Sequence, residues 1–253
     1  MIRVTACTNQ KGGVGKTTTV VNLAAYLAIS GTSTLVIDLD PQGNATSGLG
    51  IDRRSLDRSV YNVLIDRTPL DELVIGTSVD GLDLVPSSPQ LSGAEVELVD
   101  VPARERRLAA SLAELTGRYD RVLIDCPPSL GLLTINALTA ADGVLIPIQT
   151  EYYALEGLSQ LVNTIRLVRE GLNPRLEIDG VLLTMYDART NLSAQVAAEV
   201  RRHMNGTVYQ TVVPRSVRLS EAPSHGLPVA LYDPASRGAV AYRTLAGEVT
   251  ARG

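Results

Sequence analysis

Residues 9–18 read Asn9-Gln10-Lys11-Gly12-Gly13-Val14-Gly15-Lys16-Thr17-Thr18, a glycine-rich segment around which the whole chain can be interpreted. A run rich in β-branched residues (2–8) precedes it and a helical pattern (19–29) follows. In such a strand–turn–helix unit, backbone N–H groups converge on phosphate oxygens at the start of the helix. In this interpretation Lys16 neutralises the β- and γ-phosphates, and the Thr17 hydroxyl ligates Mg²⁺.

The loop departs from the general pattern G-x-x-x-x-G-K-[ST], because Gln10 stands where the first glycine is expected and a second lysine, Lys11, follows it. The chain has 23 lysines and arginines, yet Lys11 and Lys16 are its only two lysines. A compact ammonium and a planar guanidinium bind phosphate differently. We therefore infer that both loop positions require lysine chemically.

Composition limits the function classes. With 253 residues and 45% hydrophobic residues, the chain can form a sizeable core, and its net charge of −4 gives no overall attraction to nucleic acid. Binding to DNA would need a local patch. Two cysteines cannot form a disulfide framework, and we find no signal peptide or long apolar span. A cytoplasmic protein that does not associate with membranes is expected.

Apolar strands alternate with amphipathic helices along the chain. This order predicts an α/β fold: one domain over residues 1–253, a three-layer sandwich whose mostly parallel sheet is covered by helices on both faces. The expected strands are residues 2–8, 34–40, 82–86, 121–125, 143–148, 181–185 and 208–213. The expected helices are residues 16–30, 60–65, 70–75, 103–115, 132–141, 155–170, 194–204 and 236–249, and a loop is expected after residue 86.

Carboxylates follow two of these strands. Asp125 ends the strand 121–125, a usual position for an aspartate that holds Mg²⁺ directly or through water. Asp38 and Asp40 end the strand 34–40, and either could orient an attacking water. Because ligands of such sheets bind beyond the carboxyl ends of the strands, these residues and the glycine-rich loop are expected at one edge.

The motifs in combination resemble those of the ParA/MinD family of deviant Walker A P-loop ATPases. The segment 11–18 is similar to their phosphate loop, and Asp38–Asn44 and Asp125–Ser129 to their next two nucleotide motifs. The segments Tyr152–Leu158 and Pro214–Ser224 resemble those of the chromosomal ParA, or Soj, type. The resemblance covers essentially the whole chain.

The resemblance implies ATP and Mg²⁺ as cofactors and a slow ATP hydrolase. It implies that Lys11 also reaches the partner's nucleotide in an ATP-bound dimer, and that Asp40, rather than Asp38, activates water. The residues expected to contact nucleotide are Lys11, Gly12, Gly13, Val14, Gly15, Lys16, Thr17, Thr18, Pro214, Arg215 and Ser216, and those expected at Mg²⁺ are Thr17, Asp40 and Asp125. Ser216 stands where the family often has asparagine. The chain lacks an Asn-Lys-x-Asp motif, which favours ATP over GTP.

The resemblance also implies partners. Arg189 and Arg218 match positions linked to nonspecific DNA binding, and contacts from arginine to phosphate would make that binding salt-dependent. A dimer duplicates the patch and gains avidity. The family implies ATP-dependent homodimerisation, a partner protein of the ParB type that stimulates hydrolysis, and association with the nucleoid.

Three alternative functions fit the sequence less well. A MinD-like membrane ATPase would need a basic amphipathic C-terminal helix with bulky apolar residues. Residues 241–253 are not basic and apolar enough to form such a helix. An iron–sulfur relative would need suitably placed cysteines, whereas Cys7 and Cys126 are interpreted as core residues. A metabolic P-loop ligase or kinase would need an acceptor pocket, and His203 and His225 form no evident constellation.

Overall fold

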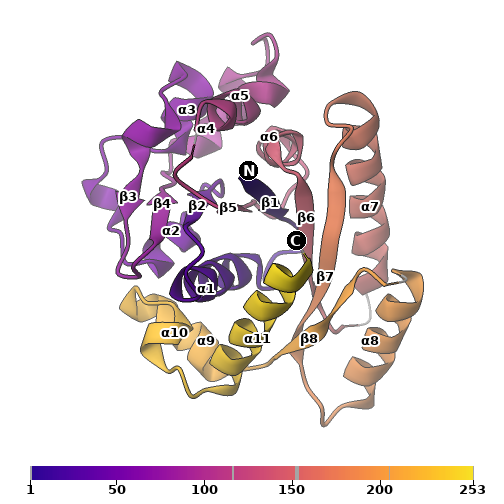
Figure 1. The fold of residues 1–253 in the computed structure, drawn as a ribbon. Helices are drawn as coiled ribbons and strands as arrows, with labels where there is room; N and C mark the ends of the chain where they lie inside the picture. Colours follow the sequence, from indigo (N-terminus) through magenta and orange to yellow (C-terminus); the bar gives the residue numbers. More distant parts are fainter. Residues whose placement is uncertain (1, 116, 152–153, 205, 253) are drawn as a thin grey trace.

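The computed structural model describes residues 2–115, 117–151, 154–204 and 206–252. Within them lies one eight-stranded sheet with the order β3-β4-β2-β5-β1-β6-β7-β8 (Figure 1). Neighbouring strands are parallel except for β3 and β4, which are antiparallel. The strands are β1 (Arg3–Cys7), β2 (Thr34–Asp38), β3 (Ile75–Gly76), β4 (Leu82–Val85), β5 (Arg121–Asp125), β6 (Gly143–Gln149), β7 (Glu177–Tyr186) and β8 (Val208–Pro214).

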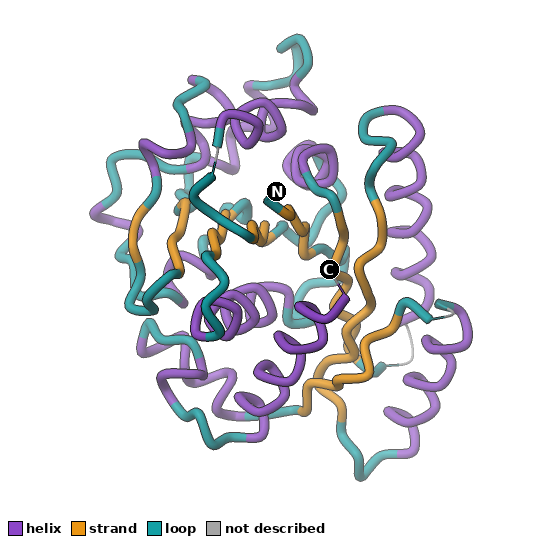
Figure 2. Tube along the Cα trace, viewed as in Figure 1, coloured by secondary structure: helices purple, strands orange, loops and turns teal. Residues whose placement is uncertain are grey.

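Helices cover both faces of the sheet (Figure 2). The α-helices are α1 (Lys16–Ile29), α2 (Asn44–Gly48), α3 (Val60–Asp66), α4 (Leu91–Glu97), α5 (Arg107–Glu114), α6 (Leu132–Ala140), α7 (Ala154–Gly171), α8 (Asn191–His203), α9 (Val217–Glu221), α10 (Val229–Tyr232) and α11 (Arg237–Arg252). Short 3₁₀ turns occur at Arg53–Ser55, Leu70–Leu73, Arg104–Arg106 and Ala222–His225.

Alternation along the central strands divides the apolar residues between two cores. In β5, Val122 and Ile124 belong to the core that packs against α5, α6 and α7, whereas Leu123 belongs to the core under α1 and α11. Successive side chains of a strand point to opposite faces, so a strand buried on both faces has to be apolar throughout. The predicted three-layer α/β class is confirmed.

Most predicted elements are confirmed to within a few residues, and three local predictions are wrong. The strand 34–40 ends at Asp38, because the backbone N–H of Asp40 turns back to the Asp38 carboxylate. The helical piece 70–75 is a 3₁₀ turn followed by β3. The loop expected after residue 86 contains α4, whose seven residues are too few to give a clear helical period.

Candidate nucleotide-binding site

The carboxyl ends of three adjacent strands meet at one edge of the sheet. Asp125 of β5 lies in register with Cys7 of β1 on one side and with Asp38 of β2 on the other. The glycine-rich loop leaves the same edge directly after β1. The prediction that the loop and the acidic strand ends share one edge is therefore confirmed.

The glycine-rich loop has the backbone that its sequence requires. Gly13 and Gly15 have φ angles of 75° and 88°, in the left-handed region that side chains disfavour. A β-carbon on Gly12 or Gly13 would meet no described atom within 4 Å, so the loop faces open space. Among the described residues no side chain caps the start of α1. Its first N–H groups are thus available to an anion.

The two lysines lie differently in the loop. Lys16 is buried, and its Nζ donates to the backbone oxygen of Lys11 at 3.2 Å, so the side chain folds back over its own loop. Lys11 is exposed, and its Nζ forms an ion pair with Glu151 Oε2 at 2.6 Å, just beyond β6. Such surface pairs contribute only about 0–1 kcal/mol. Lys11 can therefore exchange Glu151 for another anion at little cost.

The hydrogen bonds of the Asp38 carboxylate stabilise the local structure. Its carboxylate accepts hydrogen bonds from the backbone N–H and the hydroxyl of Thr46, at 2.8 and 2.6 Å, and from the backbone N–H of Asp40. These bonds attach α2 to the end of β2. Burial raises the pKa of Asp38 to about 6, and the Thr46 hydrogen bonds partly oppose that rise.

Asp40 is better placed than Asp38 to act on a ligand. It is nearly buried, and its Oδ1 accepts from the backbone N–H of Gln42 at 2.9 Å. The Ser87 hydroxyl donates to the Asp40 backbone oxygen at 2.6 Å and fixes the turn. No described residue donates to Asp40 Oδ2, which leaves one carboxylate oxygen without a partner.

Asp125 has the least satisfied carboxylate of the site. It is fully buried, and neither oxygen has a hydrogen-bond partner among the described residues. Burial raises the pKa of Asp125 well above its usual range, the charge of Asp38 adds to the rise, and the nearby Thr17 hydroxyl opposes it. A buried carboxylate without partners is costly unless a cation balances it.

These residues fit a magnesium ion. No described cluster of three or more His, Cys, Asp or Glu residues could hold a metal by itself. Mg²⁺ does not need one, because it usually keeps several waters and binds through one or two carboxylates together with substrate phosphates. The unpartnered oxygens of Asp125 and the adjacent hydroxyl of Thr17 suit that mode of binding.

A cavity of about 470 Å³ extends from the loop to the segment after β8. Gly15 and Thr18 line one side of it, and the predicted base-binding residues Pro214, Arg215 and Ser216 line another. This volume lies within the roughly 300–1,000 Å³ typical of ligand pockets. We call it the base cavity.

Outside the loop and the segment 214–224, sequence reasoning missed four residues that line the base cavity, namely Thr184, Met185, Val213 and Tyr242. Thr184 Oγ1 donates to the backbone oxygen of Val14 at 2.8 Å and so fastens β7 to the phosphate loop. Met185 has a φ of 50°, a strained value of a kind that is concentrated at functional sites. These contacts join distant parts of the chain, and no local signal could have revealed them.

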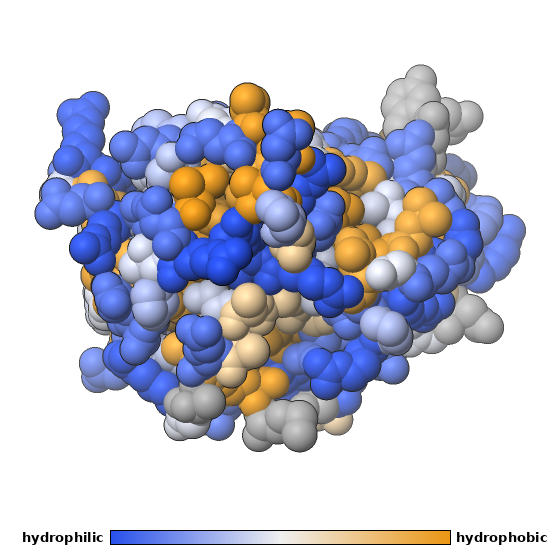
Figure 3. Space-filling view, turned by 90° about the horizontal axis from the view of Figure 1, so that it is seen from above, coloured by the Kyte–Doolittle hydropathy of each residue, from blue (hydrophilic) through white to orange (hydrophobic). Residues whose placement is uncertain are grey.

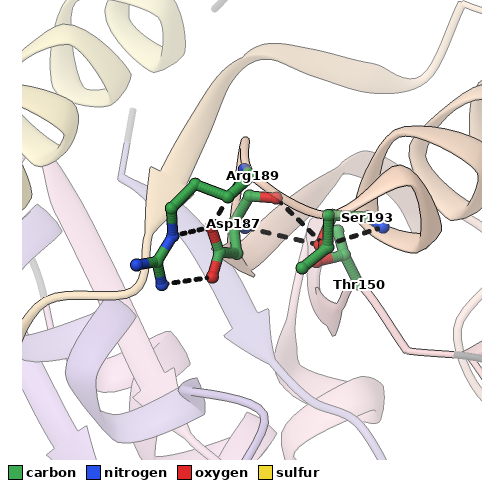
Figure 4. A network of polar contacts seen from close by, with 5 residues as sticks. Thr150, Asp187, Arg189 and Ser193 are labelled. Carbon is green, nitrogen blue, oxygen red and sulfur yellow. Dashed lines mark hydrogen bonds and ion pairs between the residues drawn. The ribbon is translucent and has the colours of Figure 1, made fainter.

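The predicted DNA-contacting arginines lie outside the base cavity. Arg189, whose side chain is 86% exposed, forms two hydrogen bonds with the carboxylate of Asp187, at 2.9 and 2.8 Å (Figure 4). Arg218 pairs with Glu221 at 2.8 Å and with Asp233 at 3.2 Å. Both guanidinium groups are exposed, but each is neutralised locally by carboxylates of this chain.

Two other predictions concern residues away from the loop. Cys7 and Cys126 are both buried and unpaired, in agreement with their interpretation as core residues. Burial raises the pKa of both thiols, which keeps them protonated. The motif that starts at Tyr152 and Tyr153 lies partly outside the described residues.

Comparison with known proteins adds an independent line of evidence. A family described as an AAA domain matches residues 2–178. The chain is 59% identical over 253 residues to the sporulation initiation inhibitor protein Soj of Bacillus subtilis, covering 100% of both chains. It is 54% identical over 250 residues to the chromosome partitioning protein ParA of Myxococcus xanthus, covering 99% of this chain and 88% of that one.

A solved structure is also similar. Cobyrinic acid a,c-diamide synthase from Mycobacterium smegmatis, with bound ADP and magnesium, matches with a TM-score of 0.87 and 40% identity. The match covers 99% of this chain and 94% of that one.

Proposed function

Because this chain belongs to the ParA/Soj family of chromosome-partitioning ATPases, we propose that it cycles between monomer and dimer by binding and hydrolysing ATP. In this cycle ATP and Mg²⁺ produce a sandwich dimer, the dimer binds DNA without sequence preference, and hydrolysis returns it to monomers. The observation that carries the proposal is the buried, unpartnered carboxylate of Asp125 at the same sheet edge as the lysine-bearing loop.

The shape and the charge of the sheet edge that carries the glycine-rich loop suit a nucleotide. The adenine would occupy the base cavity between Thr18 and Pro214. The phosphates would lie against the open backbone of Gly12 and Gly13, at the uncapped start of α1. Lys16 would leave the Lys11 carbonyl and donate to the β- and γ-phosphate oxygens, a contact that replaces one weak hydrogen bond by a charge-assisted one.

The metal would bind between Thr17 and Asp125, with Asp40 close to its water shell. When bound, Mg²⁺ neutralises part of the phosphate charge that develops during transfer. Asp125 would then be ionised, because a nearby cation offsets the burial that raises its pKa.

Hydrolysis needs a group that orients water. The free Oδ2 of Asp40 supplies an acceptor, and its Oδ1 is held by the N–H of Gln42. Lys16 and Lys11 would stabilise charge on the transferring phosphoryl group. Intrinsic turnover should be slow, and a partner of the ParB type would accelerate it.

Lys11 would couple nucleotide binding to dimerisation. Its side chain is exposed, and among the described residues that side chain pairs with Glu151. A nucleotide phosphate in the facing subunit carries more negative charge than one carboxylate. Exchange of Glu151 for that phosphate would therefore favour the dimer.

Two alternatives receive less support. In a MinD-like protein the C-terminal helix would lie on a membrane, but Tyr242, Leu245 and Ala246 of α11 are buried against α1 and β8. In the described part of the chain, no helix is long and apolar enough to cross a bilayer. The similarity to a synthase structure favours a metabolic ligase, but the chain is 40% identical to that synthase and 59% identical to Soj.

Phosphate release from Mg²⁺ and ATP tests the enzymatic part of the proposal. We expect slow, Mg²⁺-dependent hydrolysis that Asp40→Ala reduces by about 10²-fold or more. Asp80→Ala, which removes an exposed carboxylate two residues before β4, is the control and should keep the wild-type rate. Hydrolysis that is unchanged in Asp40→Ala would refute the role of Asp40.

A further inference from the structure

A second cavity lies between the end of α3 and the start of α5, and it shares no lining residue with the base cavity. Its volume is about 260 Å³, and Arg67, Arg106 and Arg107 all line it. Among its described lining residues, Glu114 is the one carboxylate. Three guanidinium groups facing a single exposed carboxylate give this cavity a positive charge within an acidic protein.

The arginines of this cavity lack the ion pairs that neighbouring arginines have. Arg104 pairs with Glu105 and Arg118 with Asp83, whereas no ion pair involves the three cavity arginines in the part of the chain that the structure describes. Figure 3 views the molecule from the side on which α3 and α5 lie in Figure 1. It shows strongly hydrophilic side chains gathered between hydrophobic ones.

Two donors at the cavity are buried without an acceptor. Nε of Arg107 and the hydroxyl of Ser111 have no hydrogen-bond partner among the described residues. Burial lowers the pKa of Arg107, and the like charge of Arg67 lowers it further. Buried polar groups are normally satisfied, so these two donors would gain an acceptor if an anion bound in the cavity.

The backbone around the cavity is also strained. Arg67 and Ala103, which both line it, have φ angles of 61° and 54°. Residues other than glycine rarely adopt these values, and they persist where the surroundings hold them in place. Arg67 itself therefore has a fixed, strained backbone, and Ala103 comes directly before the 3₁₀ turn that ends at Arg106.

We propose that this cavity binds a phosphate group, carried either by inorganic phosphate or by a small phosphorylated metabolite. The planar fork of an arginine matches phosphate with two parallel hydrogen bonds, and one such pair would satisfy the buried Nε of Arg107. The cavity is smaller than the roughly 300 Å³ at which pockets for larger ligands begin, so it suits a small anion. The buried position of two donors favours such an anion over the phosphates of duplex DNA.

The site can be tested by following the arginine Nε–H signals in NMR spectra during titration with sodium phosphate and, separately, with glycerol 3-phosphate. Ionic strength is held constant with sodium chloride. We expect a saturable shift of the Arg107 signal and an affinity about tenfold lower in Arg106→Gln, which removes one charged donor. Tighter binding of glycerol 3-phosphate than of phosphate would identify a metabolite as the ligand.

Matched controls separate this site from the others. Arg202→Gln removes an arginine on α8, whose side chain is 75% exposed, and should leave the affinity unchanged. Lys16→Ala should also leave it unchanged, which distinguishes failure of this proposal from failure of the proposed ATPase cycle. The proposal is overturned if no saturable shift occurs, if Lys16→Ala abolishes the shift, or if a DNA duplex produces the same shift at lower concentration.

Discussion

Asp125 is a buried carboxylate without a hydrogen-bond partner among the described residues, so its charge destabilises the nucleotide-free fold and becomes useful only when a cation binds. We expect Asp125→Asn to raise the melting temperature of the nucleotide-free protein, by roughly 2–4 °C for each kcal/mol gained. The same variant should lose the further stabilisation that wild-type protein gains from Mg²⁺ with ATP. Differential scanning calorimetry, with EDTA or with Mg²⁺ and ATP, measures both effects.

The dependence of stability on pH provides a second readout of the same variant. Burial raises the folded-state pKa of Asp38 to about 6 and that of Asp125 well above its usual range, and both exceed the unfolded value of about 3.9. The folded state therefore binds more protons, and without metal its stability should fall as pH rises from about 4 through 6. Asp125→Asn should flatten this fall. If the stability of Asp125→Asn fell with pH as steeply as that of the wild type, the raised pKa of Asp125 would be contradicted.

At the residue level, the sequence predicted which side chains could contribute to the nucleotide site but not which hydrogen bonds fix each of them. Lys16, Thr17 and Asp125 were identified because loop and strand-end positions are local patterns. The residue pattern left Asp38 and Asp40 open, and only the family resemblance favoured Asp40. The structure adds a physical reason, because Thr46 occupies the Asp38 carboxylate.

The turn after β2 is the element that fixes Asp40, and Arg53 holds it. Its guanidinium donates to the backbone oxygens of Pro41, at 2.8 Å, and of Gln42. Gly43, with a φ of 61°, lies so close that a β-carbon there would overlap the guanidinium of Arg53. We therefore expect Arg53 to position Asp40 through the turn.

Removal of the contact between Arg53 and the turn after β2 should slow ATP hydrolysis more than it weakens ATP binding. We expect Arg53→Ala to lower kcat by about tenfold, because small displacements of a catalytic group are costly, while KM for ATP changes little. Arg54→Ala, the neighbouring exposed arginine, is the matched control. Equal effects of the two substitutions on kcat would argue against a specific contact of Arg53 with the turn.

Elements were predictable where the hydrophobic pattern was long and regular. The buried strands β2 and β5 and the helices α1 and α7 have such patterns. The short helices α2, α4, α9 and α10 do not, because four to seven residues span too few turns to show a period. Arg53 also escaped prediction, since its contact with Pro41 spans a loop with no regular pattern.

Over the whole molecule, DNA binding has to overcome a net charge of −4. Arg189 and Arg218 are exposed, but each is paired with carboxylates of its own chain, so we expect one monomer to bind DNA only weakly. Dimerisation would double the patch and raise the affinity through avidity. DNA retention should therefore require ATP and decrease steeply with added salt.

Charge reversal at Arg218 tests this surface. We expect Arg218→Glu to reduce ATP-dependent DNA retention by at least tenfold while ATP-dependent dimerisation persists, because Arg218 lies outside the base cavity. Arg166→Glu on α7, which also replaces an exposed, ion-paired arginine, is the control. Filter binding at several salt concentrations measures retention, and undiminished binding by Arg218→Glu would locate the DNA surface elsewhere.

The most direct test of the nucleotide-driven cycle is the mass of Asp40→Ala in size-exclusion chromatography with light scattering, measured with ATP, with ADP and without nucleotide. Loss of hydrolysis should preserve the ATP-bound state, so the account predicts about twice the monomer mass of 26.9 kDa with ATP alone. Adding Lys11→Ala should return that sample to monomer. A single mass under all three conditions would contradict the account.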